Sequence, residues 1–156
     1  MKMVAMALAA LMLPGLVPVA RGEGAPVTLF ACTVGKKTVS VTRTGDQVTY
    51  RYGAAHSGAA DADELTIVGT PNSGNVFQMA QRYAGMEYQL RFTNGEFSYT
   101  VYASEGNPRV GAQAVSGLVV TKGAQRISDK SCARYATLSL PDDLQIPADT
   151  DAFSAM

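Results

Sequence analysis

The residues that could do acid–base or metal chemistry gather in one short stretch, AAHSGAADADE, which contains His56, the only histidine of the chain. Asp61, Asp63 and Glu64 follow within the next eight positions. Imidazole and carboxylate groups bind metal ions and transfer protons, so this stretch could form a metal site or an acid–base group. It could equally be a polar surface loop, because Gly, Ala, Ser and Asp dominate it. Its acidic run lacks the spacing and the central glycine of a calcium-binding loop, and we predict no bound metal and no cofactor.

Other catalytic arrangements have less support. A serine nucleophile would need His56 as its base, and the sequence has no Gly-x-Ser-x-Gly motif. The paired carboxylates Asp142 and Asp143 lie in an acidic C-terminal stretch where nothing indicates a cleft that would separate their pKa values. No phosphate-binding glycine loop and no dinucleotide fingerprint are present. We therefore predict a protein with no catalytic residues, and an enzyme that uses His56 remains an alternative.

The two cysteines, Cys32 and Cys132, lie 100 positions apart. In an oxidising compartment an isolated pair of this kind is expected to form one disulfide bond. Closing so long a loop stabilises a fold by about 4.7 kcal/mol in the chain-entropy estimate. The alternatives are two free thiols or a metal site, which would lack a second cysteine pair. A bridge would also exclude a cysteine nucleophile.

The N-terminus supports an oxidising compartment. Lys2 precedes an apolar run over residues 3–19, and small residues follow at Ala20 and Gly22. This order is typical of a secretory signal peptide over residues 1–22, and the run is too short and too interrupted by proline and glycine to span a membrane. We expect a mature protein that is periplasmic or secreted and not membrane-spanning.

The charge balance indicates which classes of molecule the protein could bind. The full chain has 13 basic and 13 acidic residues, and loss of Lys2 and Arg21 would leave 11 against 13. A mildly acidic chain without a basic patch argues against nucleic-acid binding. It is compatible with a protein partner, and the oligomeric state is left open.

The elements that would position these residues are strands. Short alternating apolar and polar segments, separated by Gly, Asn, Asp and Ser, are typical of an all-β domain. The segments are residues 27–32, 38–43, 47–52, 64–68, 76–83, 86–92, 97–102, 118–121 and 124–132. We predict a small antiparallel β-barrel or barrel-like sandwich of about eight strands, closed by the disulfide, over residues 23–137. Residues 138–156 form an acidic C-terminal tail, for which we expect an extended or partly disordered chain.

The clearest local signal is the hairpin RFTNGEFSYTVYASEGN, from Arg91 to Asn107. A two-residue turn at Asn94-Gly95 would place Phe92 opposite Phe97, Leu90 opposite Tyr99 and Tyr88 opposite Val101. Those six side chains would then share the inner face of the hairpin. Tyr102 falls on the opposite, outward face, beside a long loop over residues 104–116. We therefore interpret Tyr102, Ser104 and Glu105 as candidate partner-binding residues, together with Lys122 in the next turn.

The segments LFAC, KKTVSV and QVTYRY, this hairpin and the stretch from Leu118 to Cys132 resemble a known family. It is the family of membrane-bound and periplasmic inhibitors of C-type lysozyme, which are secreted bacterial eight-stranded β-barrels. The resemblance covers roughly residues 27–132. It implies a barrel fold and a lysozyme partner.

The inhibitory residues of that family are not matched. The family inserts a serine from a Ser-Gly motif and a lysine from a Lys-Gly loop into the acidic cleft of lysozyme. The serine position falls near Tyr88, and the lysine position falls at Glu105-Gly106. Lys122-Gly123 belongs to a later hairpin. We therefore expect a non-enzymatic binding protein, with lysozyme or another envelope protein as its partner; the alternative is a structural or envelope-associated β domain.

Overall fold

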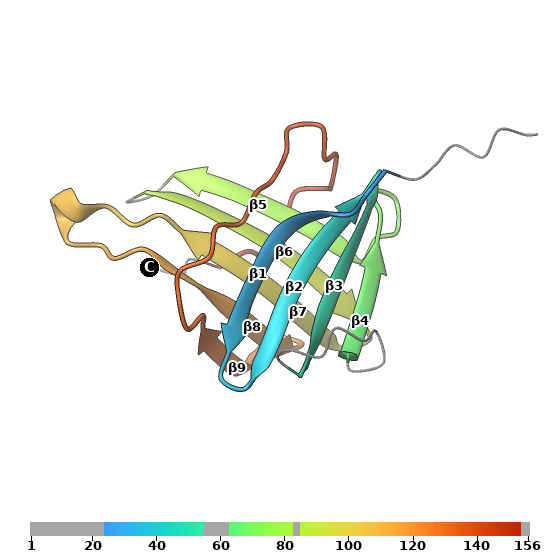
Figure 1. Cartoon of the computed structure of the whole chain (residues 1–156), viewed down its shortest axis with the longest axis horizontal. Coiled ribbons are helices and arrows are strands. Elements are labelled where there is room, and N and C mark those ends of the chain that lie inside the picture. The colour runs from blue at the N-terminus through green and yellow to red at the C-terminus, as the bar shows by residue number, and fades with distance from the viewer. Residues whose placement is uncertain (1–23, 55–62, 83–84, 154–156) are drawn as a thin grey trace, which may run out of the picture.

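The computed structural model describes residues 24–54, 63–82 and 85–153 (Figure 1). The predicted signal peptide and His56 lie outside these residues. Within them the chain forms nine strands and one short 3-10 helix. The strands are β1 (Val27–Val34), β2 (Lys37–Thr44), β3 (Gln47–Ala54), β4 (Asp63–Gly69), β5 (Val76–Arg82), β6 (Met86–Asn94), β7 (Phe97–Ser104), β8 (Val115–Lys122) and β9 (Gln125–Ser131), and the helix is η2 (Pro108–Val110). In this part of the chain no helix is long and apolar enough to cross a membrane.

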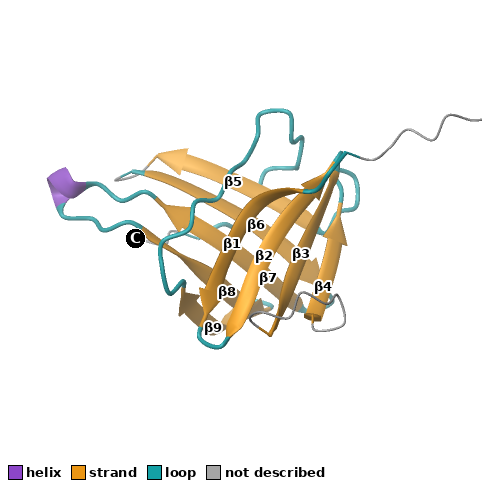
Figure 2. Cartoon of the chain, viewed as in Figure 1, coloured by secondary structure: helices purple, strands orange, loops and turns teal. Residues whose placement is uncertain are grey.

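The strands form two antiparallel sheets, in which each strand pairs with the one that follows it. The first sheet has the order β1-β2-β3-β4 and the second the order β5-β6-β7-β8-β9. The two sheets face one another with their strands crossing (Figures 1 and 2). An all-β fold is thus confirmed. Of the two predicted alternatives, a barrel and a barrel-like sandwich, the described strands form no closed barrel, and the fold is sandwich-like.

The sheets stay separate because another part of the chain occupies the edges that a barrel would join. Ala133 N donates to Thr33 O at 2.8 Å and Ser139 N to Leu29 O at 2.9 Å, so the segment after β9 lies along the edge of β1. The same segment later reaches β5, where Gln78 N donates to Pro147 O at 2.9 Å. Strand edges with paired N–H and C=O groups cannot pair with a further strand.

The hairpin of β6 and β7 forms at the predicted place but with a different register. Asn94 pairs with Phe97, so the turn consists of Gly95 and Glu96, and Phe92 lies opposite Tyr99. Gly95 has a φ of 61°, which glycine adopts without strain. The predicted register is therefore wrong by two residues. The faces are nevertheless as predicted, because side chains alternate with a period of two.

The core lies between the two sheets and consists mainly of strand residues with inward side chains. The Tyr50 ring of β3 lies 5.5 Å from the Phe92 ring of β6 and 5.6 Å from the Tyr99 ring of β7, measured between centroids. These aromatic contacts connect the two sheets. The Tyr50 hydroxyl is buried and has no hydrogen-bond partner among the described residues. Burial raises the pKa of Tyr50.

The predicted disulfide is confirmed. Cys32 in β1 is bonded to Cys132, the residue directly after β9, with a Cα–Cα distance of 5.6 Å. Because β1 and β9 belong to different sheets, the bond holds an edge of the first sheet against an edge of the second.

Residues 138–153, which we call the strap, cross from the edge of β1 to the edge of β5 and on to the outer face of the second sheet (Figure 1). Leu138, Leu144 and Ile146 are buried within the core. The strap is extended, as the sequence indicates, but it is packed. The hydrophobic core therefore continues beyond residue 137, where the sequence led us to end the β domain.

Candidate functional site

Two features of the second sheet could bind another molecule: a projecting arm and a covered outer face. The arm consists of residues 105–114, which connect β7 to β8. It extends beyond both sheets with η2 at its tip (Figure 2). It is anchored at its base, where Glu105 N donates to Met86 O at 2.9 Å.

The arm is held in one conformation by its own hydrogen bonds. Asn107 and Ala112 exchange two backbone hydrogen bonds of 2.9 and 3.0 Å. The Asn107 side chain accepts from Arg109 N at 3.0 Å, and this bond caps η2. At Gly106, φ is 68° and an added Cβ would lie 2.5 Å from the carbonyl carbon of Gln113, so the two sides of the arm approach too closely for any other residue.

The tip of the arm presents exposed side chains of two kinds. Val110 is 67% exposed, and Arg109 beside it is also exposed. Arg109 is the sole charged residue between positions 106 and 114. Among the residues that the structure describes, no carboxylate forms an ion pair with it. A cation beside an apolar side chain on a rigid projection is suited to binding a partner's recess.

The predicted partner-binding residues are not brought together. Tyr102 and Ser104 are buried, with exposures of 6% and 0%, so neither is available at the surface of this structure. Glu105 is exposed at the base of the arm. Lys122 lies at the other end of the β7–β8 pair from Ser104. At the rise per residue of a β-strand, the two ends are roughly 23 Å apart. Lys122 is near Glu96, with Nζ 3.6 Å from a carboxylate oxygen.

Tyr102 is buried because the strap covers the outward face on which it lies. Its ring meets the Phe153 ring edge-on, with centroids 5.9 Å apart. Burial, and next the charge of Asp129, raise the pKa of Tyr102. Gln89 Nε2 donates to Phe153 O and also to Glu87 Oε1, the latter at 2.7 Å. Tyr102 therefore points to the outward face of the sheet, as predicted, but it is covered there and not exposed to solvent.

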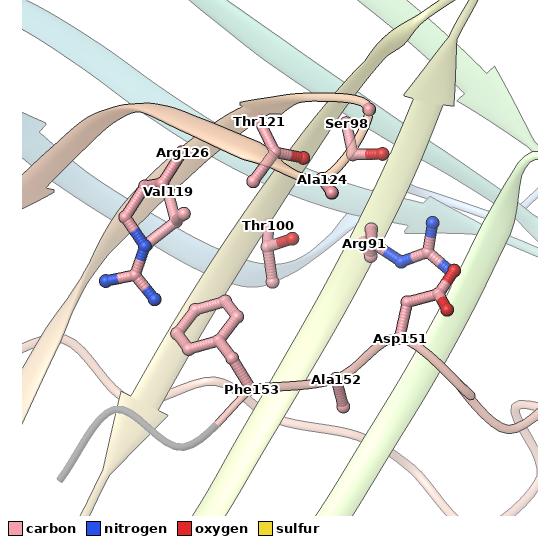
Figure 3. A pocket seen from close by; sticks show the side chains of 11 residues that line it. Arg91, Ser98, Thr100, Val119, Thr121, Ala124, Arg126, Asp151, Ala152 and Phe153 are labelled. Carbon is pink, nitrogen blue, oxygen red and sulfur yellow. The ribbon is translucent and has the colours of Figure 1, made fainter.

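The strap does not fill this face completely. A cavity of about 500 Å³ remains between the second sheet and strap residues Asp151, Ala152 and Phe153 (Figure 3). The strands contribute Arg91, Ser98, Thr100, Val119, Thr121 and Arg126, and the β8–β9 turn contributes Gly123 and Ala124. The cavity lies at the end of the second sheet away from the arm.

An ion pair holds the strap on one side of the cavity, and an arginine–ring contact holds it on the other. Arg91 donates two hydrogen bonds to Asp149, Nε to Oδ2 at 2.8 Å and Nη2 to Oδ1 at 2.7 Å. The Asp149 side chain is 1% exposed, and the bonds to it raise the pKa of Arg91. Arg126 pairs with Asp129 at 2.8 Å, and its guanidinium lies 5.0 Å from the centroid of the Phe153 ring.

The groups that could bind a metal ion are the last candidates from the sequence. Among residues 24–54, 63–82 and 85–153, no three His, Cys, Asp or Glu side chains gather as they would around a metal ion. The predicted His56 stretch lies outside the described residues except for Asp63 and Glu64. Asp63 pairs with Arg51 at 3.3 Å, and Glu64 pairs with Lys37.

Sequence reasoning missed Arg109 and the covered face. Arg109 could have been found from its position between Asn107-Pro108 and Gly111, residues that begin and end a tight turn. The cavity could not, because its walls come from strands and from a strap far along the chain. Comparison with known proteins finds no matching family model, no matching curated protein and no matching solved structure.

Proposed function

We propose that the protein is a periplasmic or secreted binding protein without catalytic activity, and that its arm inserts into a carboxylate-lined recess of a protein partner. A lysozyme is the first partner to test. The observation that carries this proposal is the exposed Arg109–Val110 pair at the tip of a hydrogen-bonded arm.

A preformed arm favours binding because little conformational entropy is lost when it is bound. Arginine is among the residues that contribute most to protein interfaces, particularly next to apolar contacts that exclude water. The guanidinium also donates two parallel hydrogen bonds to one carboxylate. An acidic cleft would therefore recognise this tip, while a basic one would repel it.

The resemblance to lysozyme inhibitors supports this choice of partner. In that family a lysine from the corresponding loop enters the lysozyme cleft, where two carboxyl groups flank the scissile bond. Glu105 stands at the lysine position in this chain and would be repelled there. Arg109, four residues later and at the tip of the arm, supplies a cation that could take the role of the lysine.

The disulfide supports an extracytoplasmic location, because such bonds persist in oxidising compartments. The alternative of a structural or envelope-associated β domain would use the C-terminal tail to bind its partner. The strap is already packed on its own sheets through Leu144, Ile146 and Asp149. We therefore prefer the arm as the binding element.

The test measures lysozyme activity. The purified, disulfide-bonded protein should slow the lysis of bacterial cells by a C-type lysozyme, as followed by turbidity. Arg109→Ala should weaken the inhibition about 30-fold, the effect of losing an interface residue that contributes about 2 kcal/mol. Arg109→Glu should abolish it, since the new charge would face carboxylates.

Lys122→Ala is the matched control. It also removes an exposed cation from the second sheet, but at the end away from the arm, and should change inhibition less than twofold. Equal effects of Arg109→Ala and Lys122→Ala would refute the role of the arm. No inhibition of C-, G- or I-type lysozymes at micromolar concentration would refute the choice of lysozyme.

A further inference from the structure

The cavity beneath the strap has a floor of hydroxyl groups. Ser98 of β7 lies opposite Thr121 of β8, and Thr100 lies opposite Val119. Opposed residues of an antiparallel pair share a face, so these side chains lie together on the outer face of the sheet (Figure 3). Each hydroxyl can both donate and accept a hydrogen bond. The floor is therefore suited to a ligand that itself carries donors and acceptors on neighbouring atoms.

The charged groups around the cavity are engaged in ion pairs. Arg91 is paired with Asp149 and lies 3.3 Å from Asp151, and Arg126 is paired with Asp129. Among the described groups around the cavity, two guanidinium groups therefore meet three carboxylates, and this excess of one negative charge disfavours an anionic ligand. Asp151, with a side chain that is 74% exposed, is still free on its outer side to accept hydrogen bonds. A ligand without negative charge therefore fits best.

The walls are partly apolar. The Phe153 ring, the Val119 methyl groups and Ala152 contribute carbon atoms beside the hydroxyl floor. A purely apolar ligand would cover the Ser98 and Thr121 hydroxyls without forming hydrogen bonds to them, which is unfavourable. A ligand with hydroxyls on one side and C–H groups on another would satisfy both the floor and the walls.

We propose that this cavity binds an uncharged saccharide, as a site separate from the arm. A volume of about 500 Å³ lies within the range of roughly 300–1,000 Å³ that is usual for small-molecule sites. The sugar hydroxyls bond Ser98, Thr100 and Thr121, the sugar C–H face lies against Phe153, and Asp151 accepts further hydrogen bonds at the rim. The site does not depend on the proposed inhibition, because the arm lies at the other end of β7 and β8.

The experiment titrates the ¹⁵N-labelled protein with glucose, galactose, mannose and N-acetylglucosamine at millimolar concentrations and follows the amide NMR signals. Glucose 6-phosphate is the charged comparison. We expect saturable shifts for at least one neutral sugar, centred on residues 98–100, 119–121 and 151–153, and weaker binding of the phosphate.

Three variants locate the site. Thr100→Val removes one hydroxyl while keeping the shape of the side chain and should weaken binding roughly three- to tenfold. Thr100→Ser keeps the hydroxyl and should bind within about twofold of the original, which shows that folding is not the cause. Thr66→Val, on the exposed side of β4 in the other sheet, is the matched control and should have no effect.

The proposal is overturned if none of the neutral sugars gives saturable shifts, or if the shifts centre on other residues. Tighter binding of glucose 6-phosphate than of glucose would also overturn it, since the ligand class would then be anionic. Equal weakening by Thr100→Val and Thr100→Ser would assign the effect to packing and refute the hydroxyl contact.

Discussion

Replacing Asp149 by asparagine tests whether charge, as well as apolar contact, holds the strap on the second sheet. The substitution keeps the size of the side chain but removes the carboxylate that accepts two hydrogen bonds from Arg91. Removing one partner of a fully buried ion pair costs about 3–5 kcal/mol. Here Arg91 is 12% exposed and keeps two other favourable neighbours, Asp151 at 3.3 Å and the Phe77 ring at 4.6 Å. We therefore expect a loss of about 2–3 kcal/mol in the free energy of unfolding, below the fully buried range.

Urea unfolding followed by circular dichroism measures this loss. With an unchanged slope, the midpoint should fall by roughly 1–2 M. The matched control is Asp151→Asn, which changes the other carboxylate near Arg91. Because Asp151 is 74% exposed, its loss should cost at most about 1 kcal/mol.

A double-mutant cycle with Arg91→Met separates the ion pair from other effects of the substitution. Once Arg91 is absent, Asp149→Asn should have little further effect. Equal destabilisation by Asp149→Asn and Asp151→Asn would refute the reasoning, and so would a change below about 0.5 kcal/mol for Asp149→Asn.

Two further predictions concern single groups. Tyr50→Phe should stabilise the protein by about 1 kcal/mol in thermal or urea unfolding, because a buried hydroxyl without a partner costs about 1–3 kcal/mol; a destabilisation would show that this hydroxyl has a favourable interaction. The hydrogen bond from Arg43 lowers the pKa of Asp143 below 3.8, so an NMR titration of its carboxyl should have a midpoint below that value and Arg43→Leu should raise it. The pKa of Asp143 is lower in the folded than in the unfolded protein. The ion pair therefore stabilises the fold fully when the pH is above the pKa of the unfolded state, and this stabilisation is lost as the pH falls through the pKa of the folded state. If Arg43→Leu left the titration midpoint of Asp143 unchanged, this explanation would be contradicted.

The sequence predicts the strands and their faces well because strand alternation is a local property. Each of the nine strands overlaps one of the predicted segments, although the predicted total was about eight and the register of the β6–β7 hairpin is missed. A turn at Asn94-Gly95 and a turn at Gly95-Glu96 give strand pairings that differ by two residues in register. Both leave Phe92 and Leu90 on the inner face, so hydrophobic alternation cannot choose between them.

The site is less predictable because it depends on contacts between distant segments. Strand parity correctly places Tyr102 on the outward side, but its burial depends on Phe153, which no local pattern connects to it. The strap shows no alternation because it bonds to strand edges at scattered points and buries Leu138, Leu144 and Ile146 at uneven intervals. An acidic, proline-containing stretch of this kind is easily interpreted as a tail.

The position of the strap in the chain has a consequence for biosynthesis. Residues 138–153 are synthesised after all nine strands. Until then, the backbone groups of β1 and β5 that later bond to the strap have no partner there. During that interval the core also lacks Leu144 and Ile146. A chain that stops short of the strap keeps those edges open and can pair with another such chain, while one that includes it closes them within the same molecule. By covering these edges, the strap protects the protein against edge-to-edge association.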